Sequence, residues 1–130
     1  MIPQYENLVG KLELASSKIP GLWQKTSDRD KFSVRINSTT ILMNSYIAFP
    51  NTDDCISFEV MNSKGEIIDG IYVDSKDFEY KRLKKLYESA RRNALRIPET
   101  LSDVVTGLDQ LLAKNGITGN SNNDNNGLPF

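Results

Sequence analysis

Few side chains in this sequence could take part in covalent chemistry. Cys55 is the single thiol, and the chain contains no histidine that could act as its base. A nucleophilic cysteine must be present as a thiolate, whereas the neighbouring Asp53 and Asp54 would raise the pKa of this thiol. The pattern therefore predicts that Cys55 is a small packing residue at the start of a strand.

Carboxylates are concentrated in the middle of the chain, where a hard cation or a pair of acid-base catalysts could use them. They are Asp53, Asp54, Glu59, Glu66, Asp69, Asp74, Asp77 and Glu79. Their spacing matches neither a calcium-binding loop nor a paired-carboxylate hydrolase, and roles in loops, turns and helix caps explain them better. Glycine-rich phosphate loops and paired cysteines are also missing from the sequence. We therefore expect no catalytic residue, no cofactor and no metal.

Basic side chains gather in a segment that is predicted to be a helix, from Asp74 to about Leu95. At 100° per residue they fall opposite the apolar stripe of that helix, and they include Lys81, Lys84, Lys85, Arg91 and Arg92. Such a face can follow the phosphates of a nucleic acid. Solvated cationic faces are common, however, and the preceding acidic hairpin could neutralise this one. Nucleic-acid binding is therefore an alternative and not the favoured prediction.

The last residues form the most pointed candidate for binding. From residue 117 onward the chain is mainly Gly, Ser, Asn, Thr and Asp without apolar periodicity, which predicts a disordered tail. The tail ends in Leu128, Pro129 and Phe130. A terminal carboxylate next to a large ring and a stiff proline would suit a pocket with an apolar floor and a basic rim. We predict protein binding through these three residues.

Hydrophobic periodicity predicts the elements that would carry these residues. A helix is expected from Pro3 to Ile19, where apolar residues recur at spacings of three and four. Four to five strands follow, with a tight hairpin connection at residues 62–65. Two helices come last, and the second, after Pro98, is expected to bury Leu101, Val104, Val105, Leu108, Leu111 and Leu112.

This order predicts an α+β fold, because consecutive strands with short turns pair antiparallel and helices then cover the sheet. We expect an N-terminal helix, an antiparallel sheet of four to five strands, two C-terminal helices packed on one face, and a disordered tail. Residues 1–116 would form a single domain and residues 117–130 the tail. The segment 39–49 is apolar on both faces, which suggests an interface, such as that of a homodimer.

Composition limits the setting in which such a domain works. The chain is 38% hydrophobic and 25% charged with a net charge of −1, so no long-range field selects a partner by sign. A single cysteine argues for a reducing compartment. Because no apolar run approaches the roughly 20 residues of a membrane span, we expect a cytoplasmic protein without a membrane partner.

Two resemblances add to these predictions. The tip from Asn122 to Phe130 resembles the tail end of bacterial single-stranded-DNA-binding proteins, in which an acidic stretch ending in Ile-Pro-Phe docks onto DNA-maintenance proteins; here Pro129 and Phe130 agree and Leu128 is a conservative change. The body, residues 8–112, resembles a group of small uncharacterised bacterial proteins. That likeness rests on Trp23, on Gly65, Ile68 and Asp69, and on Leu83, Leu86, Tyr87, Ala90, Arg91 and Arg92.

Three hypotheses of function follow. The first is a non-enzymatic protein-binding module that engages a partner, such as a DNA-maintenance protein, through its C-terminal tip. The second is an inhibitor or immunity-type protein that binds a specific protein through its sheet or acidic hairpin. The third is a weak nucleic-acid binder that uses the basic helix 81–96.

Overall fold

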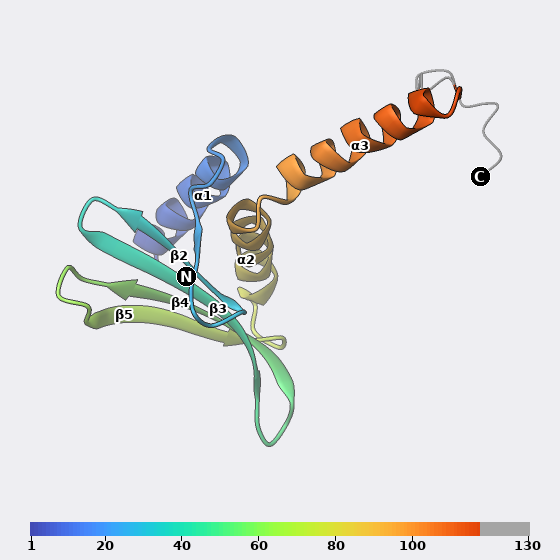
Figure 1. Ribbon diagram of the computed structural model, residues 1–130. Coiled ribbons are helices and arrows are strands. Elements are labelled where there is room, and N and C mark those ends of the chain that lie inside the picture. Colours follow the sequence, from blue (N-terminus) through green and yellow to red (C-terminus); the bar gives the residue numbers. More distant parts are fainter. Residues whose placement is uncertain (118–130) are drawn as a thin grey trace. The chain divides into compact units, whose positions relative to one another are not determined.

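The structure is a computed structural model that describes residues 1–117. Its elements are α1 (Pro3–Lys18), β1 (Gln24–Lys25), β2 (Lys31–Ile36), β3 (Thr39–Ala48), β4 (Asp53–Met61), β5 (Ile67–Asp74), α2 (Tyr80–Ala94) and α3 (Ile97–Lys114) (Figure 1). The predicted α+β fold is therefore confirmed, with a helix, a run of strands and two helices. The chain divides into two compact units, Met1–Arg96 and a second that begins at Ile97.

The five strands form one antiparallel sheet in which spatial order follows chain order, β1-β2-β3-β4-β5. Tight connections explain this meander. Asn37 adopts a positive φ of 57° between β2 and β3, and Gly65 a φ of 81° between β4 and β5. Asn and Gly are the residues that tolerate this conformation best. A register shift between Val60 and Met61 interrupts the pairing of β4 with β5.

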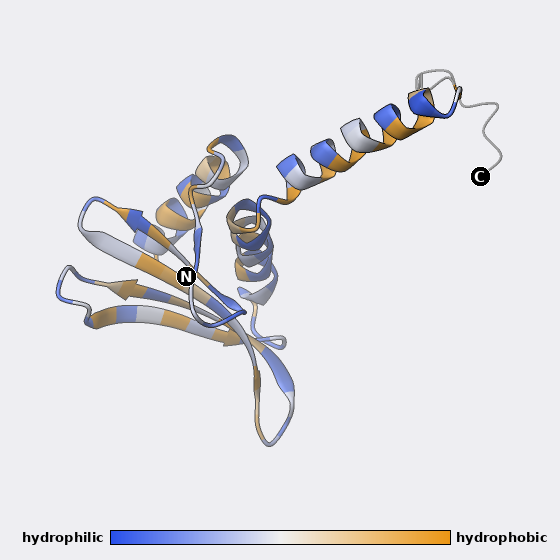
Figure 2. Ribbon diagram, viewed as in Figure 1, coloured by the Kyte–Doolittle hydropathy of each residue, from blue (hydrophilic) through white to orange (hydrophobic). Residues whose placement is uncertain are grey.

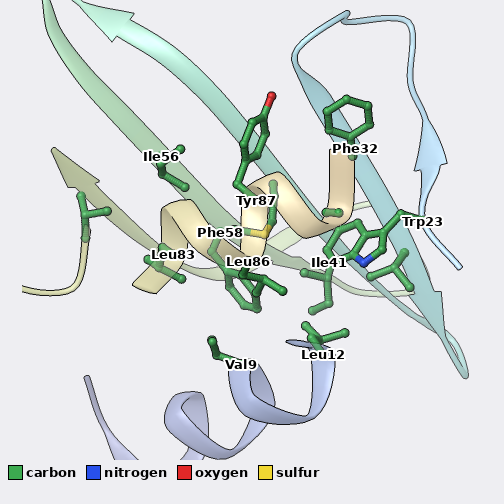
Figure 3. Packing of buried hydrophobic residues seen from close by; sticks show 14 residues of the cluster. Val9, Leu12, Trp23, Phe32, Ile41, Ile56, Phe58, Leu83, Leu86 and Tyr87 are labelled. Carbon is green, nitrogen blue, oxygen red and sulfur yellow. The ribbon is translucent and has the colours of Figure 1, made fainter. Parts of the chain in front are cut away.

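Helices α1 and α2 cover one face of this sheet and enclose the core (Figures 1 and 3). Val9 and Leu12 of α1 meet Leu83 and Leu86 of α2 in one buried cluster with the inward side chains of the strands. Phe58 of β4 is completely buried within this cluster. Burial of this many apolar side chains is the main source of stability for the unit.

A polar junction joins α1, α2 and the segment at Trp23 that leads into β1. The Asn93 side chain accepts a hydrogen bond from the Trp23 backbone N–H (2.8 Å) and donates to the carbonyls of Ser16 (3.0 Å) and Ile19 (2.8 Å). The Trp23 indole donates to Ser16 Oγ at 2.8 Å. Trp23 is thus a core residue and is only 1% exposed.

The start of α2 differs from the predicted one. The helix begins at Tyr80, and residues 74–79 form a hydrogen-bonded turn rather than the first helical turn. Asp77 Oδ2 accepts from the Asp74 backbone N–H at 2.8 Å, and Asp74 Oδ1 accepts from the Lys76 N–H at 2.8 Å. Aspartates bond to nearby backbone groups in this way when they compete with helix formation, which explains the later start.

Helix α3 also departs from the prediction, because its apolar side chains were expected to be buried. Leu101, Val104, Val105, Leu108 and Leu111 are 51% to 57% exposed. The helix is the only described element of its unit, so nothing in that unit covers its apolar side. Figure 2 shows hydrophobic residues following one side of α3. It ends at Lys114, and Gly116 follows with a φ of 75°, a conformation that is common just after helix ends.

Tyr87 provides a pH-dependent prediction for the core. Its hydroxyl donates to the Asp30 carbonyl at 2.7 Å, and burial raises the pKa of Tyr87 to about 12. A raised folded pKa means that the stabilisation is fully present below pH 10 and is lost as the pH rises from about 10 to 12. We expect unfolding free energy to fall over this window, and to fall less in Tyr87→Phe. Denaturant titrations of both proteins at pH 9 and pH 11.5 measure this free energy. An equal decrease between the two pH values in the wild type and in Tyr87→Phe would contradict the prediction.

Candidate protein-binding surface

Among residues 1–117, the two most exposed large apolar side chains lie at one end of the sheet. Phe49, in the turn between β3 and β4, is 82% exposed, and Phe78, in the turn between β5 and α2, is 96% exposed. The sequence predictions did not include Phe78. The signal for Phe78 was its place between Asp77 and Glu79, outside the apolar stripe of the following helix. Such rings are typical anchors of protein interfaces.

The two turns are tied together at the start of β4. Ser75 N–H donates to the Asp54 carbonyl at 3.0 Å, and Lys76 Nζ lies 3.3 Å from Asp53 Oδ2. Because Asp53 pairs with Ala48 across the hairpin, both aromatic turns flank the same pair of aspartates. Hydrogen bonds within the 74–79 turn hold the backbone that carries Phe78. Pre-ordered turns lose little conformational entropy on binding, which favours affinity.

Acidic residues flank the two turns that carry the rings. Asp54 and Asp77 are exposed and Asp53 and Asp74 half-buried, while Lys76 is the basic residue between them. The wider segment from Asp53 to Glu79 contains eight acidic and two basic residues. We call this surface, made of Phe49, Asp53, Asp54, Asp74, Asp77 and Phe78, the acidic-aromatic end. Its charge suits a basic partner.

The face of the sheet that lies opposite the helices adjoins the acidic-aromatic end. Leu42 and Tyr46 lie on it, whereas Ile41 and Met43 on the same strand face the core. Ile47 has the same strand phase as Ile41 and Met43 but is 48% exposed, near the end of β3. Tyr72 on β5 is also exposed, and its hydroxyl donates to Glu59 Oε2 at 2.7 Å. That hydrogen bond to Glu59 raises the pKa of Tyr72 above its ordinary value, and desolvation adds to the effect.

The basic face of α2 lies on the helical layer. Lys81, Lys85, Arg91 and Arg92 are exposed and Lys84 is half-buried, so the predicted face does form. Among the ion pairs of residues 1–117, only Arg82 of this helix takes part, and it bonds Glu6 and Glu13 of α1. The acidic hairpin that was considered as a neutralising partner contributes none of these pairs. The basic face of α2 and the acidic hairpin of β4 and β5 thus lie on different elements of the first unit.

The other sequence candidates are placed as follows. Cys55 is buried, and its thiol lies 3.6 Å from the Asp53 carbonyl. No group of three or more acidic or thiol side chains among residues 1–117 could hold a metal ion. No helix within that range is long and apolar enough to cross a membrane. Leu128, Pro129 and Phe130 lie outside the described residues.

Comparison with known proteins adds no relative to this picture. No protein-family model, curated protein or solved structure matches the chain.

Proposed function

We propose that this chain is a non-enzymatic protein-binding module whose binding surface is the acidic-aromatic end. The observation that carries the proposal is the presence of two almost fully exposed phenylalanine rings, Phe49 and Phe78, on hydrogen-bonded turns. Exposed rings of this size gain free energy only when a partner covers them. The surrounding carboxylates favour a partner with a basic surface, and they reject acidic surfaces through like-charge repulsion.

The module corresponds to an inhibitor or immunity-type protein, the second hypothesis from sequence. A basic partner surface covered by an acidic one is the arrangement by which such a protein would block a target. The single cysteine supports placing this protein in the cytoplasm. The tip Leu128, Pro129 and Phe130, with its likeness to the tails of bacterial single-stranded-DNA-binding proteins, stays a prediction of a second binding element.

The proposal is tested by capturing partners from a lysate of the cells that naturally make this protein. The wild type and matched variants are used as bait. We expect Phe49→Ala/Phe78→Ala to weaken binding of the captured partner by roughly 100-fold, since interface anchors each contribute about 1–2 kcal/mol or more. Asp54→Lys should also weaken it, with the largest effect at low salt. Titration of the purified partner by calorimetry gives the dissociation constants.

Two further variants separate this surface from the alternatives. Removal of Leu128, Pro129 and Phe130 should leave the partner bound, as should Lys85→Glu/Arg92→Glu. If removal of the tip abolishes capture and the double alanine variant binds normally, the tip is the binding element and our assignment is wrong. A different result would favour the basic helix: only Lys85→Glu/Arg92→Glu loses binding, and the affinity of the wild type for a nucleic-acid duplex decreases steeply with salt.

A further inference from the structure

Helix α3 cannot owe its stability to its own composition. It has 18 residues, and these include Gly107, two valines and two threonines but only one alanine. Even alanine-rich helices shorter than about 12–15 residues are marginal in water, and most helical stability in proteins comes from the packing of an apolar face. Glycine costs about 1 kcal/mol more than alanine within a helix. A stable α3 therefore needs its apolar side covered by another surface.

The apolar side has the spacing of a helix-pairing seam. Ile97, Leu101, Val104, Leu108 and Leu111 follow one another at intervals of four, three, four and three. That is the a/d pattern of paired helices, in which each seam residue inserts between residues of a facing helix. Val105 and Leu112 widen the stripe on one side. Ser102, Thr106 and Asp109 lie on the opposite, polar side.

We propose that α3 pairs with α3 of a second copy of this chain in an antiparallel two-helix interface. A twofold axis that crosses the apolar seam at the level of residue 106 places Leu101 opposite Leu111 of the second copy. It also places Val104 opposite Leu108 of that copy. Every seam side chain between 101 and 111 then meets an apolar one. The same axis brings Gly107 next to its own copy, where the absence of a side chain allows close approach.

Charge selects the antiparallel orientation. Two acids, Glu99 and Asp103, lie near the start of α3, and Lys114 ends it. Antiparallel pairing brings Lys114 of one copy level with Pro98 of the other, near the acidic start of that helix, and sets the helix dipoles against each other. Parallel pairing would place like charges side by side at both ends.

The area is large enough for a specific pair. Five half-exposed seam and flanking residues, together with their neighbours, offer roughly 500 Å² on each copy, so that about 1,000 Å² is buried in total, which reaches the lower limit for specific association. An interface of this size suits a weak dimer that forms and dissociates with protein concentration.

Sedimentation of the full chain between 1 and 200 µM tests the pairing. We expect the mass to rise from that of a monomer to that of a dimer, and Leu108→Asp to raise the dissociation constant by roughly 100-fold or more, because a carboxylate enters the seam twice. Thr106→Asp on the polar side is the matched control and should dimerise normally. Fluorescence of the buried Trp23 confirms that the first unit stays folded. A monomeric wild type, or a dimer insensitive to Leu108→Asp, overturns the proposal.

Cysteine cross-linking in a Cys55→Ala background tests the orientation. An equal mixture of Leu101→Cys and Leu111→Cys proteins should form mixed disulfide dimers, whereas each protein alone should not. Efficient cross-linking of Leu101→Cys with itself would mean parallel pairing and contradict the antiparallel geometry. Failure of all mixtures, with the wild type dimeric, would place the interface elsewhere.

Discussion

Replacing Asn93 with alanine should cost about 3–4 kcal/mol of unfolding free energy, because a buried amide with three partners is lost. The Trp23 backbone N–H and the carbonyls of Ser16 and Ile19 would each lose a hydrogen bond in a site that water enters poorly. Each orphaned buried group costs about 1–3 kcal/mol. The expected loss is smaller than the summed cost of the three orphaned groups, because water can partly enter the site.

Urea unfolding followed by fluorescence of Trp23 measures this effect. Ser89→Ala, on the same helix but without a role in the junction, is the matched control and should change stability by less than about 0.5 kcal/mol. Asn93→Asp keeps the acceptor for Trp23 but removes both donors, so it too should be strongly destabilising. A loss of less than about 1 kcal/mol for Asn93→Ala would show that the polar junction contributes little to the stability of the fold.

Phe58→Ala should destabilise the first unit by about 3–5 kcal/mol, because it opens a cavity in the middle of the core. The ring is fully buried and meets the edge of the Tyr5 ring at a centroid distance of 5.8 Å. Its loss therefore also removes an aromatic pair between β4 and α1.

Phe78→Ala is the matched control for this substitution. The same side chain is removed at a site that is 96% exposed, so its unfolding free energy should change by less than about 0.5 kcal/mol. Thermal unfolding by calorimetry compares the two variants directly. Equal destabilisation would contradict both the buried position of Phe58 and the exposed position of Phe78.

The predicted fold followed from periodicity and turn chemistry, and both are local properties of the chain. Apolar and polar residues alternate from 32 to 36, which is typical of a strand, and Gly65 lies in the predicted hairpin connection between β4 and β5. The start of α2 was misplaced because Asp74 and Asp77 suit a helix cap and an isolated turn equally well. Their bonds to the Asp74 and Lys76 backbone decide between the two, and a pattern of residue types does not contain them.

Burial was harder to predict than secondary structure. The stripe of α3 resembles that of α2, and periodicity alone does not show whether a stripe meets its own core or another chain. For the same reason, Phe49 and Phe78 look like core residues by type. Only the placement of their turns around Asp53 and Asp54 brings them together as a candidate surface. The basic face of α2, by contrast, was predictable because helical spacing alone defines it.

The outer position of β5 has a consequence for behaviour at high concentration. An edge strand offers unpaired backbone groups to which strands of other molecules can add, and the exposed Ile67 and Ile68 would favour such addition. The register shift at Val60 and Met61 twists this edge, and Asp69 Oδ1 accepts a hydrogen bond from the adjacent Gly70 N–H at 2.9 Å. An irregular, negatively charged edge is a poor template for fibril growth. Loss of the Asp69 carboxylate would therefore make the protein prone to aggregate.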